Sequence, residues 1–160
     1  MNIRVGDPIP EVTLKRMRDG IETVDTAALF DGRRVVLFAV PGAFTPTCSA
    51  RHLPGFIERF ADFRQRGIEV YCMAVNDPFV MQAWAENQHV PDGLQMLSDG
   101  NGDFSRALGL VQDASATGMG MRSRRFALYV DDGSVRGVWV DDPGQFEVSS
   151  ADHVLKQLPL

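Results

Sequence analysis

Two apolar runs separated by a long amphipathic segment constrain the fold of this chain more than any other feature. The runs Arg34–Val40 and Ile68–Val75 are short and rich in β-branched residues, which is typical of strands buried on both faces of a sheet. The apolar residues of the segment between them recur at i, i+3, i+4 and i+7: Leu53, Phe56, Ile57 and Phe60. This spacing predicts a helix over Thr47–Arg66 that buries one of its faces. Two strands joined through such a helix are expected to lie parallel, with a right-handed crossover.

The rest of the chain extends this unit into a layered α/β arrangement. We expect the following further elements: a strand at Val12–Leu14, a short helix at Thr26–Phe30, a helix at Pro78–His89, a strand at Leu94–Leu97, a short helix at Phe104–Leu108, a hairpin of strands Phe126–Val130 and Val135–Val140, and a last helix at Ser150–Leu158. This alternation of strands and helices, which ends in a hairpin and a last helix, predicts a central mixed sheet with helices on both faces. A βαβ half followed by a ββα half is the thioredoxin-like arrangement, and we expect it to occupy residues 1–160 as one domain.

The charge and hydropathy of the chain argue against nucleic acid and membrane partners. The formal net charge is −5, so no basic stripe is expected to neutralise phosphates. No apolar run approaches the roughly 18 residues needed to cross a bilayer. The N-terminal residues lack an apolar signal core, and a cytoplasmic location is therefore expected.

The cysteines and histidines do not form a metal site or a disulfide framework. The chain has two cysteines, Cys48 and Cys72, and neither belongs to a Cys-x-x-Cys pair. The three histidines, His52, His89 and His153, lack metal-ligand spacing, so no metal is expected. Each cysteine therefore needs an explanation of its own.

Cys48 lies where the strand Arg34–Val40 gives way to the predicted long helix. Pro46 fits the first helical position, and Thr45 fits the N-cap before it. Cys48 then lies in the first turn, where free backbone N–H groups and the helix dipole favour an anion. Because the thiolate is the reactive form of cysteine, this position indicates redox or nucleophilic chemistry. From the spacing alone, a buried and inert cysteine is an equal alternative.

The sequence around Cys48 resembles the active-site signature of the peroxiredoxins. The match is Pro41-x-x-x-Thr45-x-x-Cys48, within the longer string PGAFTPTCS that begins at Pro41. That string, followed by RHLPGF at residues 51–56, is similar to the type-five (type II) branch of the family. The similarity continues within residues 75–84 and over 118–127, so it covers nearly the whole chain.

The resemblance implies a thioredoxin-fold, thiol-dependent peroxidase that reduces hydrogen peroxide and small organic hydroperoxides without metal, haem or flavin. Cys48 would be the peroxidatic nucleophile, which attacks a peroxide oxygen and becomes a sulfenic acid. Thr45 would hydrogen-bond the thiolate and the bound peroxide, and Pro41 would shield the thiolate from water. Arg125, directly before the predicted strand Phe126–Val130, would be the cation that folding brings to the thiolate. Such donors suit the charge that develops on a leaving oxygen.

The resemblance also implies a homodimer formed by loops beside the active site. Phe79 and the loop that contains Met119 and Met121 match that region. Apolar residues in a glycine-rich loop are hard to bury in a monomer, which favours the same dimer contact. His52, four residues after Cys48, is at a spacing that can share its helical face; it is expected to be a structural hydrogen-bonding residue, and the alternative is that it tunes the pocket.

Cys72 decides how such an enzyme would be recycled. It lies within the predicted strand Ile68–Val75, so a buried position is expected. Some relatives carry a resolving cysteine before the last helix, but Gln145–Ser150 contains none, and Val148 takes its place. We therefore expect a one-cysteine cycle, in which glutathione captures the sulfenic acid and glutaredoxin or a second thiol releases it. The alternative is a two-cysteine cycle with Cys72 as the resolving thiol and thioredoxin as the electron donor.

Two functions of other classes remain open. A thiol–disulfide oxidoreductase usually has a Cys-x-x-Cys pair, but Thr45 stands where its first cysteine would be. A non-enzymatic redox sensor would pass oxidation to a partner protein. Such a sensor would react fast with peroxide and turn over slowly with every small thiol.

Overall fold

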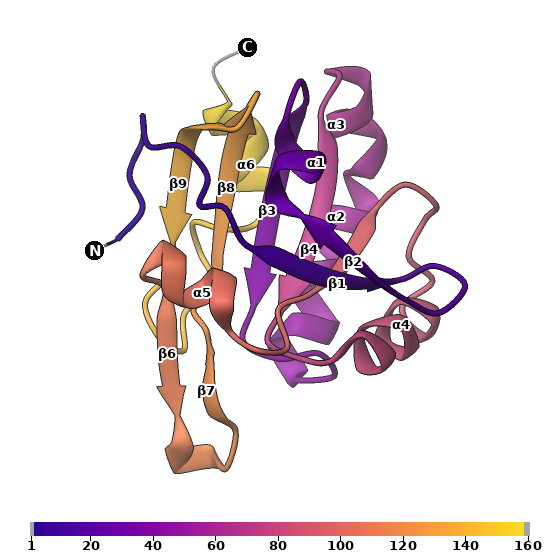
Figure 1. Ribbon diagram of the computed structural model, residues 1–160, viewed down its shortest axis with the longest axis vertical. Helices are drawn as coiled ribbons and strands as arrows, with labels where there is room; N and C mark the ends of the chain where they lie inside the picture. Colours follow the sequence, from indigo (N-terminus) through magenta and orange to yellow (C-terminus); the bar gives the residue numbers. More distant parts are fainter. Residues whose placement is uncertain (1, 159–160) are drawn as a thin grey trace.

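A seven-stranded mixed sheet in the order β2-β1-β5-β4-β3-β8-β9 forms the centre of the computed structural model, which describes residues 2–158 (Figure 1). Its strands are β1 (Thr13–Met17), β2 (Ile21–Asp25), β3 (Arg34–Val40), β4 (Glu69–Ala74), β5 (Gln95–Ser98), β8 (Phe126–Asp131) and β9 (Ser134–Val140). A separate two-stranded sheet pairs β6 (Val111–Ala114) with β7 (Gly120–Ser123). The helices are α1 (Thr26–Phe30), η1 (Cys48–His52), α2 (Leu53–Glu58), α3 (Phe60–Gln65), α4 (Pro78–Asn87), α5 (Asp103–Leu108), η2 (Ser115–Thr117) and α6 (Ala151–Gln157).

The strand pairings confirm the thioredoxin-like α/β fold expected from the sequence. β3 runs parallel to β4, as the long connecting helix requires, and β4 runs parallel to β5. On its other side β3 pairs antiparallel with β8, and β8 pairs antiparallel with β9. The sheet is therefore mixed, with β3 between a parallel and an antiparallel neighbour.

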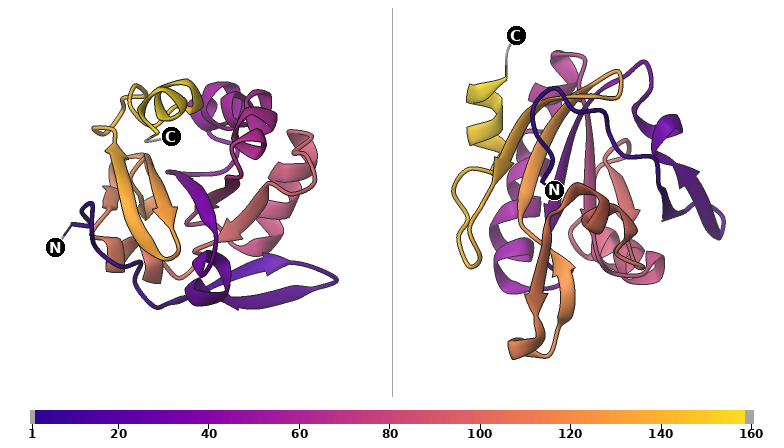
Figure 2. Two further views of the ribbon diagram at one scale, coloured as in Figure 1. Left: turned by 90° about the horizontal axis from the view of Figure 1, so that it is seen from above. Right: turned by 60° about the vertical axis from the view of Figure 1, so that its left-hand side comes forward.

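Both faces of the sheet are buried, which explains the continuous apolar runs of β3 and β4. Alternate β3 residues Val36 and Phe38 pack with α2, α3, α4 and α6, whereas Val35 and Leu37 pack with α1 and α5. Figure 2 shows this division, with α6, α2 and α3 on one side of the sheet and α1 on the other. The long apolar strands are thus packed on both faces.

The structure corrects three sequence-based expectations. The helix predicted over Thr47–Arg66 is interrupted: it starts at Pro46, passes through a π-helical turn at Cys48–His52 and breaks at Arg59, whose φ and ψ are −95° and 5°. The sequence predicts no strand between Val12–Leu14 and the helix Thr26–Phe30, but β2 lies there, paired with β1. The β6–β7 hairpin was not predicted, because its strands are polar and glycine-containing rather than apolar.

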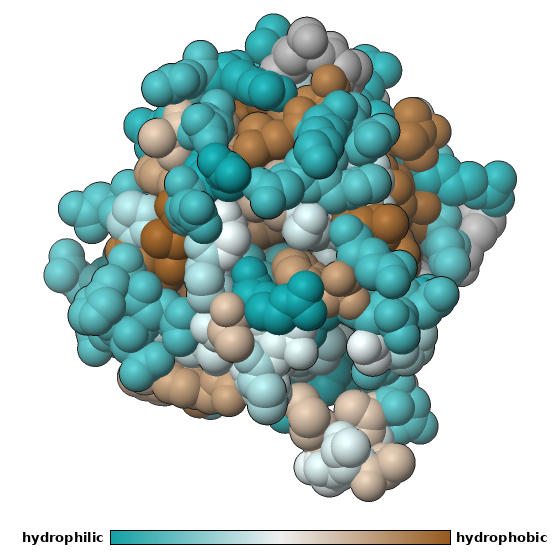
Figure 3. Space-filling model, turned by 180° about the vertical axis from the view of Figure 1, so that it is seen from behind, coloured by the Kyte–Doolittle hydropathy of each residue, from teal (hydrophilic) through white to brown (hydrophobic). Residues whose placement is uncertain are grey.

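The β6–β7 hairpin extends away from the central sheet (Figure 1). Seen from behind, it projects at the lower right, and its tip is coloured tan to white rather than teal (Figure 3). The tip is thus less hydrophilic than most of the surrounding surface in that view.

Candidate active site

The pairing of β3 with β8 brings Arg125 to the end of the sheet where the Cys48 segment begins. The two strands are antiparallel, with Ala39 opposite Phe126, so Arg125 comes next to the carboxyl end of β3. The chain leaves β3 at that same end, and the helix that contains Cys48 starts at Pro46. Residues that are far apart in the sequence therefore meet at the carboxyl end of a central strand, which is the usual location of sites in open α/β sheets.

The guanidinium of Arg125 contacts the sulfur of Cys48 directly. Its Nη2 donates a hydrogen bond to Cys48 Sγ at 3.2 Å, and both residues are buried, with Cys48 0% and Arg125 9% exposed. A guanidinium only donates hydrogen bonds, so this contact places a positive charge beside the sulfur in a site shielded from water. The cation expected from the resemblance is therefore present, in contact with the expected nucleophile.

His52 holds the other side of the same guanidinium. Its Nε2 lies 3.0 Å from the carbonyl oxygen of Ser149, which can only accept, so Nε2 carries the proton. Its Nδ1 then accepts a hydrogen bond from Arg125 Nη1 at 2.8 Å. Burial and the nearby Arg125 charge lower the pKa of His52 to about 3, so the ring is neutral at physiological pH. The structural role of His52 is thus to orient Arg125 through the hydrogen bond at Nδ1.

The hydroxyl of Thr45 does not make the N-cap hydrogen bond expected from the sequence. It donates a hydrogen bond to the carbonyl oxygen of Gly42 at 2.7 Å, and the backbone carbonyl of Thr45 accepts from Ser49 N–H at 2.9 Å. The hydroxyl proton is thereby committed to Gly42, while the oxygen lone pairs stay available as acceptors. Pro41, half-buried, directly follows β3. The structure thus places Pro41 and Thr45 in the turn between β3 and Cys48.

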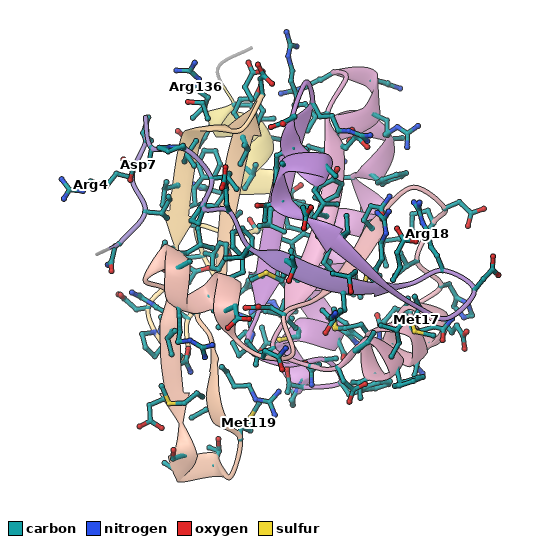
Figure 4. The ribbon with its side chains drawn as sticks, in the orientation of Figure 1. Arg4, Asp7, Met17, Arg18, Met119 and Arg136 are labelled. Carbon is teal, nitrogen blue, oxygen red and sulfur yellow. The ribbon has the colours of Figure 1, made fainter. Side chains whose placement is uncertain are left out.

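Gly42 leaves the space in which the hairpin approaches this turn. A Cβ at residue 42 would lie 3.0 Å from Met119 Cε and 3.1 Å from Thr45 Cγ2, closer than side chains normally pack. Met119, labelled in Figure 4, lies between η2 and β7 at the end of the projecting hairpin. The hairpin and the Cys48 turn are therefore adjacent in space.

Comparison with known proteins agrees with this geometry. Residues 4–155 match the family model described as Redoxin. Peroxiredoxin-2B of Arabidopsis thaliana is 46% identical over 163 residues, which cover 98% of each chain. Among solved structures, a Burkholderia cenocepacia protein described as a putative thioredoxin reductase has a TM-score of 0.96 at 44% identity, covering 99% of each chain. Reduced Prx3 of Vibrio vulnificus, in complex with hydrogen peroxide, has a TM-score of 0.92 at 42% identity, covering 96% of this chain and 98% of its own.

The chain belongs to the peroxiredoxin family. More closely, it is a peroxiredoxin of the type II subfamily, as its resemblance to the type-five branch indicated. It is accordingly a thiol peroxidase, and its substrates are peroxides.

The second cysteine of this peroxiredoxin is buried in the sheet, as predicted. Cys72 lies in β4 opposite Phe38 of β3 and belongs to the same core cluster as Cys48. Burial raises the pKa of the Cys72 thiol well above its ordinary value, and the nearby Cys48 adds to the rise. Cys72 is therefore a protonated, inaccessible thiol in this conformation.

Two contacts that the sequence did not reveal hold the active-site segment of the peroxiredoxin. Asn76 Oδ1, just after β4, accepts from Ala43 N–H at 2.9 Å. Trp84, fully buried in α4, donates from Nε1 to the hydroxyl oxygen of Ser49 at 2.9 Å. Both residues lie within residues 75–84, which resemble the family. That resemblance was the only feature of the sequence that could have indicated their role.

Three of the residues expected at a dimer contact differ in exposure. Phe79 at the start of α4 and Met121 in β7 are 61% and 57% exposed, whereas Met119 is half-buried.

Among residues 2–158 there is no helix long and apolar enough to cross a membrane. In the same part of the chain, no group of three or more histidine, cysteine or carboxylate side chains could hold a metal ion.

The neutral, buried state of His52 should make the stability of this peroxiredoxin fall in acid. A histidine in the unfolded chain has a pKa near 6.5, whereas the pKa of folded His52 is about 3, so between these values only the unfolded state binds the proton. This contribution is complete above pH 6.5 and is lost progressively towards pH 3, with about 2 kcal/mol lost at pH 5. Urea unfolding at pH 7 and pH 5 should show that His52→Gln loses about 2 kcal/mol less than the wild type between these two values. An equal loss in both proteins would contradict the assignment.

Proposed function

We propose that Cys48 is the peroxidatic cysteine and that this enzyme reduces hydrogen peroxide and small organic hydroperoxides through a Cys48 sulfenic acid. The thiolate sulfur attacks one peroxide oxygen, an S–O bond forms, and the O–O bond breaks. The leaving oxygen takes up a proton and departs as water or an alcohol, while the sulfur is oxidised by two electrons. The contact between Arg125 Nη2 and Cys48 Sγ is the observation that carries this proposal. The hydrogen peroxide complex of Vibrio vulnificus Prx3 supports the same substrate class.

The three other catalytic roles follow from the chemistry of their groups. Arg125 places a positive charge beside the sulfur and offers N–H donors to the leaving oxygen as negative charge develops there. Because the hydroxyl proton of Thr45 is donated to Gly42, Thr45 Oγ1 acts as an acceptor for a peroxide O–H, which orients the O–O bond. Pro41, without an N–H, shields the thiolate from water at the end of β3.

For recycling, we favour the one-cysteine cycle. Glutathione attacks the sulfenic acid, releasing water and leaving a mixed disulfide on Cys48. Glutaredoxin or a second glutathione then attacks this disulfide and restores the Cys48 thiolate. Val148 at the place of the resolving cysteine and the fixed position of Cys72 in β4 support this order. The alternative, in which Cys72 resolves and thioredoxin donates, requires the Cys48 turn to unwind towards the sheet.

Replacing Cys72 with serine should leave turnover with glutathione and glutaredoxin nearly unchanged, because no bond to Cys72 forms in the proposed cycle. The intact mass after one equivalent each of peroxide and glutathione should show one glutathione adduct on both the wild type and Cys72→Ser. A wild-type product two hydrogens lighter than the reduced protein, together with loss of turnover in Cys72→Ser, would instead identify a Cys48–Cys72 disulfide. A sulfenic acid that no small thiol reduces quickly would indicate a redox sensor.

We also propose that the enzyme is a homodimer, with Phe79, Met119 and Met121 at its contact. The exposure of Phe79 and Met121 supports this, since large apolar side chains on the surface favour a protein partner. The cytoplasmic location and the single-domain organisation over residues 1–160 stay predictions.

A further inference from the structure

The loop after β9 is folded around one buried carboxylate, that of Asp141. Asp141 is 3% exposed, and its Oδ1 accepts from the backbone N–H groups of Glu147 and Val148, both at 2.9 Å. Its Oδ2 accepts from the backbone N–H of Ser149 at 3.2 Å and from the Ser149 hydroxyl at 2.6 Å. All four donors come from the end of the loop, so this carboxylate closes residues 141–149 on themselves.

This closed loop reaches the active site through Ser149. The carbonyl oxygen of Ser149 accepts from His52 Nε2, and the Nδ1 of His52 accepts from Arg125, whose other nitrogen contacts Cys48. The loop also holds the backbone of the same arginine, because Asp141 N–H donates to the carbonyl oxygen of Arg125 at 2.9 Å. Arg125 is therefore fixed at its backbone by one end of the loop and at its guanidinium, through His52, by the other.

An aromatic residue of the same loop packs over these groups. The ring of Phe146 lies 4.9 Å from that of His52, and Arg125 Cζ lies 5.7 Å from the Phe146 ring centre. Arg51 Cζ lies 4.8 Å from the same centre. A loop that opened would remove this cover together with the Ser149 carbonyl.

We propose that Asp141 is a positioning residue for the peroxide reaction: by closing the loop 141–149, it fixes the Ser149 carbonyl that orients His52 and, through it, Arg125. An unrestrained arginine side chain has many rotamers, whereas transition-state stabilisation needs its donors at fixed positions. Burial raises the pKa of Asp141, but hydrogen bonds from Ser149, Val148 and Glu147 outweigh it and hold the pKa below the ordinary value. The carboxylate is thus ionised in neutral solution and can accept all four bonds. This inference rests on the proposed roles of Cys48 and Arg125.

The variant Asp141→Asn tests this role, because its amide nitrogen would face two donors where an acceptor oxygen now stands. Stopped-flow measurement of the oxidation of the reduced protein by hydrogen peroxide should show a rate constant roughly ten- to a hundredfold below that of the wild type. In an Arg125→Ala background, the same substitution should cause no further slowing, because the residue through which it acts is gone. Equal slowing in both backgrounds, or an unchanged rate in the first, would overturn the proposal.

Asp99→Asn is the matched control. Asp99 is also 3% exposed and accepts from Phe104 N–H, Ser105 N–H and the Ser105 hydroxyl at 3.0, 2.8 and 2.7 Å. It thus closes a segment in the same way as Asp141, but no hydrogen bond links it to His52 or Arg125. Folded Asp99→Asn should oxidise at the wild-type rate; slowing equal to that of Asp141→Asn would show that any loss of buried carboxylate bonding has this effect.

Ser149→Ala decides the matter if Asp141→Asn does not fold. It removes only the bond from the hydroxyl to Asp141 and keeps the carbonyl that His52 contacts. Its oxidation should be slower than that of the wild type, again only when Arg125 is present, and a wild-type rate would refute the proposal. Peroxide consumption by Cys48→Ser would refute the proposed function itself, a result separate from either outcome at Asp141 or Ser149.

Discussion

Replacing Cys48 with serine is expected to reduce the rate of peroxide reduction by on the order of a thousandfold or more, because the nucleophile itself is lost. A serine hydroxyl remains protonated at neutral pH and cannot be oxidised to a sulfenic acid. The measurement is the consumption of hydrogen peroxide by the reduced protein at one equivalent, followed by turnover with glutathione and glutaredoxin.

The matched control for this experiment is Cys72→Ser, which removes the other buried thiol and should consume peroxide at the wild-type rate. Serine is close in size to cysteine, and its oxygen can still accept from Arg125, so Cys48→Ser should remain folded by circular dichroism. Peroxide consumption by folded Cys48→Ser as fast as by the wild type would refute the mechanism.

Replacing Arg125 with alanine should slow the peroxide step by roughly a hundredfold or more, the usual cost of removing a donor that faces developing charge. The substitution removes the positive charge beside Cys48 Sγ and leaves His52 Nδ1 without its donor. The rate constant for oxidation of the reduced protein measures this step without the later thiol reactions.

Arg125→Lys should restore only part of the rate, because a lysine is a point charge and lacks the planar fork that reaches both His52 and Cys48. Arg136→Ala is the matched control, since Arg136 is an exposed arginine of β9 at the opposite end of the sheet (Figure 4). A wild-type rate in Arg125→Ala would contradict a catalytic role for Arg125, without affecting the role proposed for Cys48.

The centre of the fold could be predicted because its strands are buried on both faces. β3 and β4 are read directly from their apolar runs, and the helical spacing between them requires a parallel pair. β6 and β7 could not be predicted, because polar and glycine-containing strands carry little local signal and form through pairing with neighbours. β2 was not predicted either, although three of its five residues are β-branched, so its composition favoured a strand. The π-helical turn at Cys48–His52 could not be predicted either. The spacing of apolar residues indicates which face of a helix is buried, but not which carbonyl oxygen accepts from each backbone N–H.

The candidate site shows the same limit. The position of Cys48 at a helix start is a local property and could be predicted, but the role of Arg125 came only from the family resemblance. Its contact depends on the antiparallel register of β3 and β8, which no local pattern specifies. For His52, the helical spacing from Cys48 could be read from the sequence. Its hydrogen-bond partners Arg125 and Ser149 could not, because they lie 73 and 97 residues away along the chain.

The complete burial of Cys48 separates the two halves of the catalytic cycle by the size of the reagent. Hydrogen peroxide is hardly larger than water and can enter a site that ordinary packing motions admit. A thiol of the size of glutathione, or any protein thiol, is far too large to reach a sulfur with no exposed surface, so it can react only after the turn at Cys48–His52 has opened. Peroxide therefore reacts with the closed conformation, whereas the thiol reductant reacts only with an open one.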